Sequence, residues 1–233
     1  MMKFLYILGA IVLMAFALVA YTSTVRYRLT VNVETPEGIK AGSGVIEVRT
    51  WFRRAWTAHL FGGSTKDVSV TGEAVPVDLG PRGVLFVLLN CKNKNNRPID
   101  CGRNKLPVQV LRRSGEIKTL DEVDAERVVR SAKGPRAVVV EDMPFMVRFK
   151  DVSDPKSVEA VDPSTLDLSF GTGVQIRDVT LEMTADRVTT GIAKILPWLG
   201  QYSGTMLDGN RLERLDKDLG LSNHLTTAAF KNS

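Results

Sequence analysis

The chain has 233 residues and a formal net charge of +5, with 44% hydrophobic and 24% charged residues. This composition excludes a disordered chain, and 19 Gly and 10 Pro without a repeat exclude a collagen-like fibre. The basic residues are scattered in short pairs, and the motifs of nucleic-acid-binding modules are absent, so we expect no nucleic acid as partner. The length allows one large domain or two small ones.

The start of the chain is strongly apolar. The run from Phe4 to Tyr21 contains no charged residue, and about 18 helical residues extend over roughly 27 Å, close to the hydrocarbon thickness of a bilayer. Lys3 precedes the run, and a short positive leader stays in the cytoplasm, which directs the following chain outward. We therefore predict that residues 1–24 form a transmembrane anchor in contact with the lipid bilayer, and that residues 25–233 lie outside the cytoplasm.

Two other interpretations of the apolar run stay open. Ala15 and Ala17, on either side of Phe16, are the small residues that a signal-peptidase site needs, so the run can be a signal peptide whose cleavage releases the body into the periplasm. A helix buried inside the body is the third interpretation. If the anchor is retained, the protein is a single-pass inner-membrane protein with a periplasmic body.

The two cysteines fit an oxidising compartment. Cys91 and Cys101 flank a polar stretch of nine residues, KNKNNRPID. In an exported chain such a pair is most simply a disulfide. Zinc sites need closely spaced cysteines with further Cys or His ligands, and a CxxC redox motif is absent. We expect a structural disulfide, with two free thiols as the alternative.

The body begins with the alternation that is typical of β-strands. Apolar and polar residues alternate from Tyr27 to Glu34 and again from Ile46 to Phe52, with a turn expected at Pro36-Glu37-Gly38. These two segments should form a hairpin or neighbouring strands. The run from Val84 to Leu89 is apolar throughout, which predicts a strand buried on both faces. Three further strands are expected at Val68 to Val70, Ala74 to Leu79 and Val108 to Leu111.

The character of the sequence changes near residue 115. Thr119 stands three residues before Glu122 in the capping-box pattern, which predicts a helix. The acidic residues Asp121, Glu122, Asp124 and Glu126 are typical of a helix start rather than of an acid–base pair. Strands should follow at Ala137 to Val140 and at Phe145 to Phe149.

Several shorter features are expected towards the C-terminus. A change of phase near Arg177-Asp178 predicts a β-bulge. The remaining expectations are short helical turns at Asp154-Pro155 and Asp162-Pro163, a short helix capped by Thr190 and ended or kinked by Pro197, a turn at Asp208-Gly209, a helix over Leu212 to Leu219, and a loose tail over the last dozen residues.

The most distinctive local motif is TWFRRAWTAHLF at residues 50–61. Aromatic rings interleaved with arginines suit a membrane interface or a partner-binding rim. We favour the alternative that the aromatic side chains fill the core, because most large apolar residues are buried. The candidate interaction patch consists of Trp51, Phe52, Arg53, Arg54 and Trp56.

Catalytic and cofactor motifs are weak. His59 and His224 are the only histidines, and neither a GxSxG elbow nor an SxxK motif occurs. Gly42-Ser43-Gly44 precedes a strand rather than a helix, and Gly171-Thr172-Gly173 lacks the third glycine of a dinucleotide fingerprint. We assign no catalytic residue, metal ligand or cofactor.

Two parts of the sequence carry a resemblance to a known group. PFMVRFKDVSDPKSVEAVDPSTLDLSFGTGVQIRDVTLEMT, with VTTGIAKILPWL after it, and the opening YRLTVNVETPEGIKAGSGVIEVRT resemble a family of uncharacterised bacterial envelope proteins with an N-terminal hydrophobic segment. The resemblance implies a bacterial source and an envelope location. It brings no activity and no site residue.

Together these features predict an α+β protein with a mainly antiparallel, sandwich-like body and a few short helices behind one N-terminal transmembrane helix. Residues 25–113 should form the sandwich-like region and residues 114–233 a mixed α+β region, with a single shared domain as the alternative. We expect a non-enzymatic binding or scaffolding module with an envelope protein as partner. The alternatives are an envelope hydrolase that uses His59 and an accessory subunit of a membrane complex.

Overall fold

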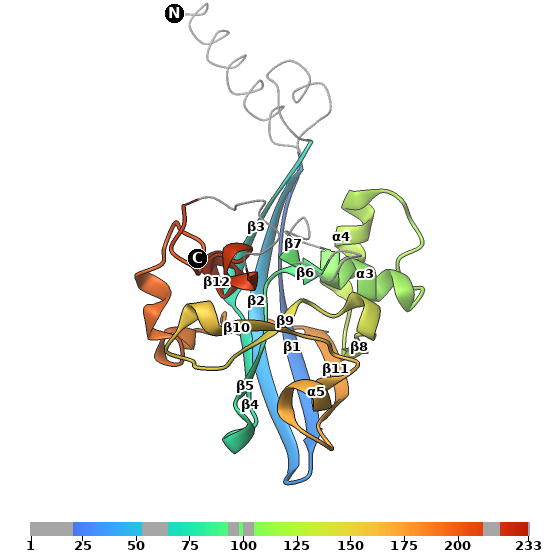
Figure 1. Cartoon of the computed structure of the whole chain (residues 1–233). Helices are drawn as coiled ribbons and strands as arrows, with labels where there is room; N and C mark the ends of the chain where they lie inside the picture. Colours follow the sequence, from blue (N-terminus) through green and yellow to red (C-terminus); the bar gives the residue numbers. More distant parts are fainter. Residues whose placement is uncertain (1–20, 53–64, 93–97, 100–104, 212–219, 233) are drawn as a thin grey trace, which may run out of the picture.

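A long β-hairpin forms the axis of the molecule (Figure 1). In the computed structural model, which describes residues 21–52, 65–92, 98–99, 105–211 and 220–232, strand β1 (Tyr21–Thr35) pairs with β2 (Gly38–Phe52) over the full length of both strands. The two-residue turn lies at Pro36-Glu37, as predicted. The strand alternation is confirmed as well, because every second residue of β1 from Ser23 to Thr35 is buried.

The hairpin is the centre of a six-stranded antiparallel sheet with the order β12-β3-β2-β1-β11-β8. Strand β1 pairs with β11, and the register skips Arg177 between Asp178 and Ile176, which confirms the predicted bulge. Strands from both predicted regions, 25–113 and 114–233, share this sheet. The outer strands are β3 (Lys66–Glu73), β11 (Gln175–Met183), β8 (Arg136–Ala137) and β12 (Lys231–Asn232).

A second sheet of four strands has the order β10-β9-β5-β4. Its central strand β5 is buried on both faces, as predicted: Leu85 and Val87 join a core shared with the six-stranded sheet, whereas Phe86 faces a second core. The strands are β4 (Val75–Asp78), β5 (Val84–Val87), β9 (Met146–Phe149) and β10 (Val158–Val161), and β6 (Cys91–Lys92) with β7 (Pro98–Ile99) forms a separate pair.

The two sheets pack closely against each other where β4 lies on β2. A Cβ atom at Gly42 would lie 2.3 Å from the carbonyl oxygen of Pro76, and one at Gly44 would lie 2.9 Å from the side chain of Val75. Glycine in the middle of a strand is therefore required here by packing. The Gly-Ser-Gly stretch is part of β2 and not the lead-in to a strand.

Helix α3 (Lys105–Arg113) corrects the prediction of a strand at Val108 to Leu111. Leu106, Val110 and Leu111 recur at helical spacing and are buried in the first core. The alternation of Val108 with Val110 fits both structures over so short a run, and the helical spacing becomes visible only when Leu106 is included. The predicted sandwich-like region therefore ends in a helix.

Helix α4 (Glu122–Ser131) confirms the predicted helix but shifts its cap. Asp121 is the N-cap, and its Oδ1 accepts a hydrogen bond from the backbone N–H of Asp124 at 2.8 Å. Thr119 instead accepts from the backbone N–H of Asp121 at 3.0 Å. Leu120 therefore precedes the helix and is 91% exposed rather than part of its buried face.

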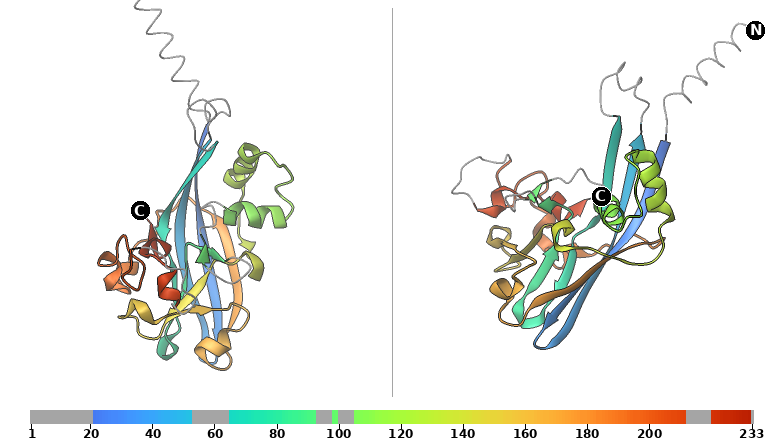
Figure 2. Two further views of the ribbon diagram at one scale, coloured as in Figure 1. Left: turned by 45° about the horizontal axis from the view of Figure 1, so that its top comes forward. Right: turned by 90° about the vertical axis from the view of Figure 1, so that its right-hand side faces the viewer.

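The C-terminal segment packs against the four-stranded sheet, so the prediction of a loose tail is wrong. Leu225, Ala229 and Phe230 are buried in the second core together with Trp198. Phe149 and Phe230 lie with ring centroids 5.7 Å apart. The sequence of this segment is mostly polar, but three of its apolar residues, Leu225, Ala229 and Phe230, face one core. Figure 2 shows this segment on the opposite side of the hairpin from α3 and α4.

Short helices make up most of the remaining structure. Asp154 caps η3 as predicted, whereas Asp162 closes a turn before α5 (Leu166–Phe170) instead of starting a helix. Gly191, not Thr190, is the N-cap of η4, and Pro197 begins a helical turn rather than ending one. The 3-10 helices are Gly80–Arg82 (η1), Val140–Asp142 (η2), Pro155–Ser157 (η3), Ile192–Lys194 (η4), Pro197–Gly200 (η5), Leu221–Asn223 (η6) and Thr227–Ala229 (η7).

The predicted turn at Asp208-Gly209 is confirmed and is part of a polar network. The Asp208 carboxylate accepts hydrogen bonds from the backbone and side-chain amides of Asn210 and from the side-chain amide of Asn223. Burial of this carboxyl group opposes ionisation, but the three hydrogen bonds outweigh it and lower its pKa. The network holds the C-terminal segment against the preceding loop.

Hydrogen bonds from Arg82 stabilise the hairpin turn. Arg82 donates from Nε and Nη2 to the two carboxylate oxygens of Glu37, at 3.1 and 2.9 Å, and from Nη1 to the carbonyl oxygen of Phe170 at 3.0 Å. The hydrogen bonds from Arg82 lower the pKa of Glu37 to about 2. One side chain therefore joins the β1–β2 turn, η1 and the C-terminal end of α5.

Candidate functional site

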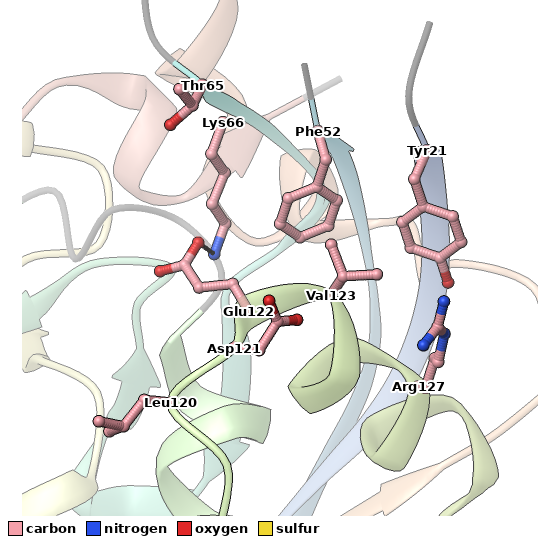
Figure 3. Close-up of a pocket in the computed structure, with 9 residues that line it drawn as sticks. All are labelled: Tyr21, Phe52, Thr65, Lys66, Leu120, Asp121, Glu122, Val123 and Arg127. Atoms are coloured by element: carbon pink, nitrogen blue, oxygen red, sulfur yellow. Dashed lines mark ion pairs between the residues drawn. The ribbon is translucent and has the colours of Figure 1, made fainter. Parts of the chain in front are cut away.

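The opposite end of the hairpin carries an open pocket of about 520 Å³, which we call the hairpin-end pocket (Figure 3). Tyr21 pairs with Phe52, and Phe52 pairs with Lys66, so the start of β1, the end of β2 and the start of β3 lie side by side. The N-terminal part of α4 forms the other wall. The lining residues are Tyr21, Phe52, Thr65, Lys66, Leu120, Asp121, Glu122, Val123 and Arg127.

Aromatic rings form one wall of the hairpin-end pocket. The ring centroids of Tyr21 and Phe52 are 5.7 Å apart and the rings are tilted by 33°. The Lys66 ammonium group lies 5.6 Å from the centroid of the Phe52 ring, within the range of a cation–π contact. The pocket therefore combines an apolar surface with a positive charge held close to it.

The pocket lining also carries charges of both signs. Lys66 Nζ lies 3.1 Å from Glu122 Oε2, which Figure 3 marks as an ion pair. Arg127 forms an ion pair with Asp124 at 2.5 Å. Glu122, Arg127 and Asp124 are exposed and Lys66 is partly buried, so each pair adds little to stability and can exchange with solvent or with a ligand. Such a lining suits a ligand that itself carries both charges.

A buried carboxylate fixes α4 beside the strand ends. Glu126 is 1% exposed, and its two oxygens accept hydrogen bonds from the hydroxyl groups of Ser23, at 3.3 Å, and Thr50, at 3.4 Å. Arg130 of the same helix donates to the Tyr21 hydroxyl at 3.1 Å. The polar contacts of α4 with β1 and β2 therefore set the width of the hairpin-end pocket.

The sequence predicted Glu126 only as one of four acids at a helix start. Its role is different, because it shares the buried face of α4 with Ala125 and Val129. A carboxylate among buried apolar residues needs hydrogen-bond donors across the interface. The available signal was its position beside Ala125 and three residues before Val129, but its hydrogen-bond donors come from strands that are distant in sequence.

The predicted interaction patch is only partly described. Phe52 is 7% exposed and contributes to the wall of the hairpin-end pocket, which agrees with the interpretation that the aromatic residues are buried. Trp51 is half-buried, with the Arg49 guanidinium 6.0 Å from its ring centroid. Arg53, Arg54 and Trp56 lie outside the described residues. The patch stays a prediction.

The other candidate residues also divide into those that the structure describes and those outside the described ranges. Cys91 lies at the start of β6 and is partly buried, whereas Cys101 is outside the described residues, so the disulfide stays a prediction. His59 is outside them as well. His224 follows η6 and is half-buried. Within the described ranges, no group of three or more His, Cys, Asp or Glu side chains could hold a metal ion.

The anchor prediction lies almost wholly outside the described residues. Tyr21, the last residue of the apolar run, is the first residue of β1, and residues 22–24 continue that strand, so the predicted anchor is wrong over residues 21–24. The helices that the structure describes, between residues 21 and 232, include none that is long and apolar enough to span a membrane.

Comparison of the chain with family models, curated proteins and solved structures finds no match. The resemblance to envelope proteins therefore stays a prediction.

Proposed function

We propose that the protein is a membrane-anchored, exported binding module of the cell envelope. The observation that carries this proposal is the position of Tyr21. It is the last residue of the apolar run from Phe4, and it is also the first residue of β1 and part of the wall of the hairpin-end pocket. An anchor joined at this point holds the hairpin-end pocket close to the bilayer.

The connection between anchor and body is short and stiff in this proposal. Tyr21 pairs with Phe52, and Thr22 with Trp51, so the body begins its hydrogen-bonded sheet directly after the apolar run. A strand in a sheet cannot swing as a Gly/Ser linker does. The hairpin turn lies at the opposite end of β1 and β2 from Tyr21 (Figure 1), so an anchor at Tyr21 orients the turn away from the membrane.

The hairpin-end pocket favours binding over catalysis as the role of this end. Lys66 and Glu122 already form an ion pair across it, Arg127 is paired with the neighbouring Asp124, and the backbone around them is part of a sheet and a helix. A preformed surface with exchangeable ion pairs is suited to recognition of a charged ligand or of an envelope protein partner.

Protease protection on intact bacterial cells that express the full chain tests the topology. We expect external protease to digest residues 25–233 once the outer barrier is permeabilised, and mass spectrometry to find an uncleaved N-terminus in the membrane fraction. The substitution Val12→Arg should move the protein out of the membrane fraction, because arginine in the centre of a span costs about 2.5–3.5 kcal/mol. Val12→Leu is the matched control.

Three results would contradict the proposal. An N-terminus that begins after Ala17 would show a cleaved signal peptide and a released body. Full protection of the body after permeabilisation would place it in the cytoplasm. An unchanged membrane fraction in the Val12→Arg variant would show that the apolar run does not hold the protein in the bilayer.

A further inference from the structure

We propose that the hairpin-end pocket binds the headgroup of a zwitterionic phospholipid that carries a phosphate and a primary ammonium group, as phosphoethanolamine does. This inference rests on the proposed function, because it needs the anchor to bring the pocket to the bilayer. Its ligand chemistry comes from the pocket itself. Both signs of charge line the pocket beside aromatic rings.

Tyr21 determines the level at which the hairpin-end pocket lies relative to the bilayer. Tyrosine at the end of a membrane span lies among the lipid headgroups, and the interfacial layer on each side of the hydrocarbon core is about 5–7 Å thick. The Tyr21 side chain lines the pocket. A pocket that shares a side chain with the end of the span therefore opens at headgroup level.

The charges of the pocket match the two charges of the headgroup. Lys66, which is partly buried, and Glu122, which is exposed, form an ion pair at 3.1 Å. A headgroup phosphate can take the place of Glu122 beside Lys66, while the ammonium group binds Glu122, so that one internal ion pair is replaced by two intermolecular ones. A purely anionic headgroup would satisfy Lys66 but would meet the carboxylates of Glu122 and Asp121, while Arg127, the other cation of the lining, is already paired with Asp124.

An apolar side chain stands at the rim of the same pocket. Leu120 is 91% exposed although it borders the apolar atoms of the pocket. Figure 3 shows that it points away from the rings of Tyr21 and Phe52. A leucine in this position contributes binding energy only when a further apolar surface covers it. The methylene carbons of a bound headgroup supply such a surface.

Hydrogen exchange of the full chain in lipid nanodiscs tests the inference. Nanodiscs of phosphatidylcholine are compared with discs in which half of the lipid is phosphatidylethanolamine or phosphatidylglycerol. We expect peptides that cover residues 120–131 and 66–73 to exchange about threefold more slowly with phosphatidylethanolamine, as for a ligand at about twice its dissociation constant. Peptides of the second core should not change.

Two substitutions separate headgroup binding from general attraction to a membrane. Lys66→Gln removes the partner of the phosphate and should abolish the slower exchange. Glu122→Gln removes the partner of the ammonium group and should transfer the protection from phosphatidylethanolamine to phosphatidylglycerol. Lys40→Gln, in β2 near the hairpin turn, is the matched control and should leave the protection unchanged.

Equal exchange in phosphatidylcholine and phosphatidylethanolamine discs would overturn the inference while leaving the anchor intact. Stronger protection by phosphatidylglycerol in the unmodified chain would overturn it too, because it would show attraction to negative charge alone. Loss of protection in the Lys40→Gln control would assign the effect to the whole body and not to the pocket. A chain that does not stay in the discs would instead contradict the proposed function.

Discussion

Gly42 and Pro76 bring the two sheets together through their backbones. A Cβ atom at Gly42 would lie 2.3 Å from the carbonyl oxygen of Pro76 and 2.8 Å from a methyl carbon of Val77. The carbonyl group is part of β4 and cannot move aside as a flexible side chain could. The contact fixes the distance between β2 and β4.

Substitution of Gly42 by alanine should therefore destabilise the protein. Overpacking of this kind costs about 1–3 kcal/mol, and a clash with backbone lies at the upper end of that range. Urea unfolding followed by circular dichroism measures the change. Gly200→Ala is the control, because a Cβ atom there meets nothing within 4 Å, and its free energy of unfolding should stay within about 0.5 kcal/mol of the original. Equal effects of the two substitutions would contradict this account.

The ion pair of Glu37 with Arg82 predicts a pH dependence. The pKa of Glu37 is lowered from 4.5 to about 2 by hydrogen bonds from Arg82. A lowered pKa in the folded state stabilises the protein above the unfolded pKa, and this contribution is lost as the pH falls from 4.5 towards 2. The Glu37→Gln variant should therefore lose less stability than the unmodified chain as the pH falls over this interval.

The measurement is the free energy of unfolding of both chains at several pH values between 7 and 2. Asp167→Asn, an exposed carboxylate of α5, serves as the control and should keep the original profile. Parallel profiles for Glu37→Gln and the unmodified chain would show that the arginine contact does not shift the titration of Glu37.

The buried carboxylate of Glu126 predicts a specific loss of stability. Glu126→Ala leaves the hydroxyl groups of Ser23 and Thr50 without this acceptor, which costs about 1–3 kcal/mol. Hydrogen exchange should increase first in α4 and in the adjoining ends of β1 and β2. The substitution Glu122→Ala, at the exposed N-terminal end of the same helix, should change stability by less than about 0.5 kcal/mol. A uniform increase of exchange over the whole body would contradict a local role for Glu126.

The aromatic cluster of the second core predicts that the C-terminal segment is essential for stability. Phe230 is fully buried and its ring lies within 6.3 Å of Phe86 and 6.0 Å of Trp198. Phe230→Ala should cost about 3–5 kcal/mol. Leu168→Ala, at a residue that is 81% exposed, is the control and should have a small effect. Thermal unfolding by calorimetry distinguishes the two, and equal melting temperatures would show that the segment is not part of the cooperative core.

The strands that alternate strongly could be predicted from sequence. Residues 27 to 34 alternate because one face of β1 is buried, and residues 84 to 89 are apolar throughout because β5 lies between two cores. The phase change that indicated the bulge opposite Asn32 and Val33 was equally visible. Local sequence patterns predict a strand correctly where each face of the strand meets a single environment, either core or solvent.

Other elements depend on partners that are distant in sequence. Val108 to Leu111 is too short to distinguish a strand from a helix without the packing of α3 against the first core. The tail was misjudged because its apolar residues are few, yet Leu225 and Phe230 complete the second core. The hairpin-end pocket was not predicted at all, since Tyr21, Phe52 and Lys66 become neighbours only through strand pairing.

Pairing between remote positions also governs when the body can fold. Asn32 and Asp178, 146 positions apart, face each other in the sheet, and Asn232 pairs with Gly72. Contacts over such separations form slowly. A polypeptide threaded outward from its N-terminus would therefore wait, with β1 and β2 exposing an uncovered apolar face, until its last residues have emerged. Chaperones and proteases outside the cytoplasm would have that interval in which to bind or cut it.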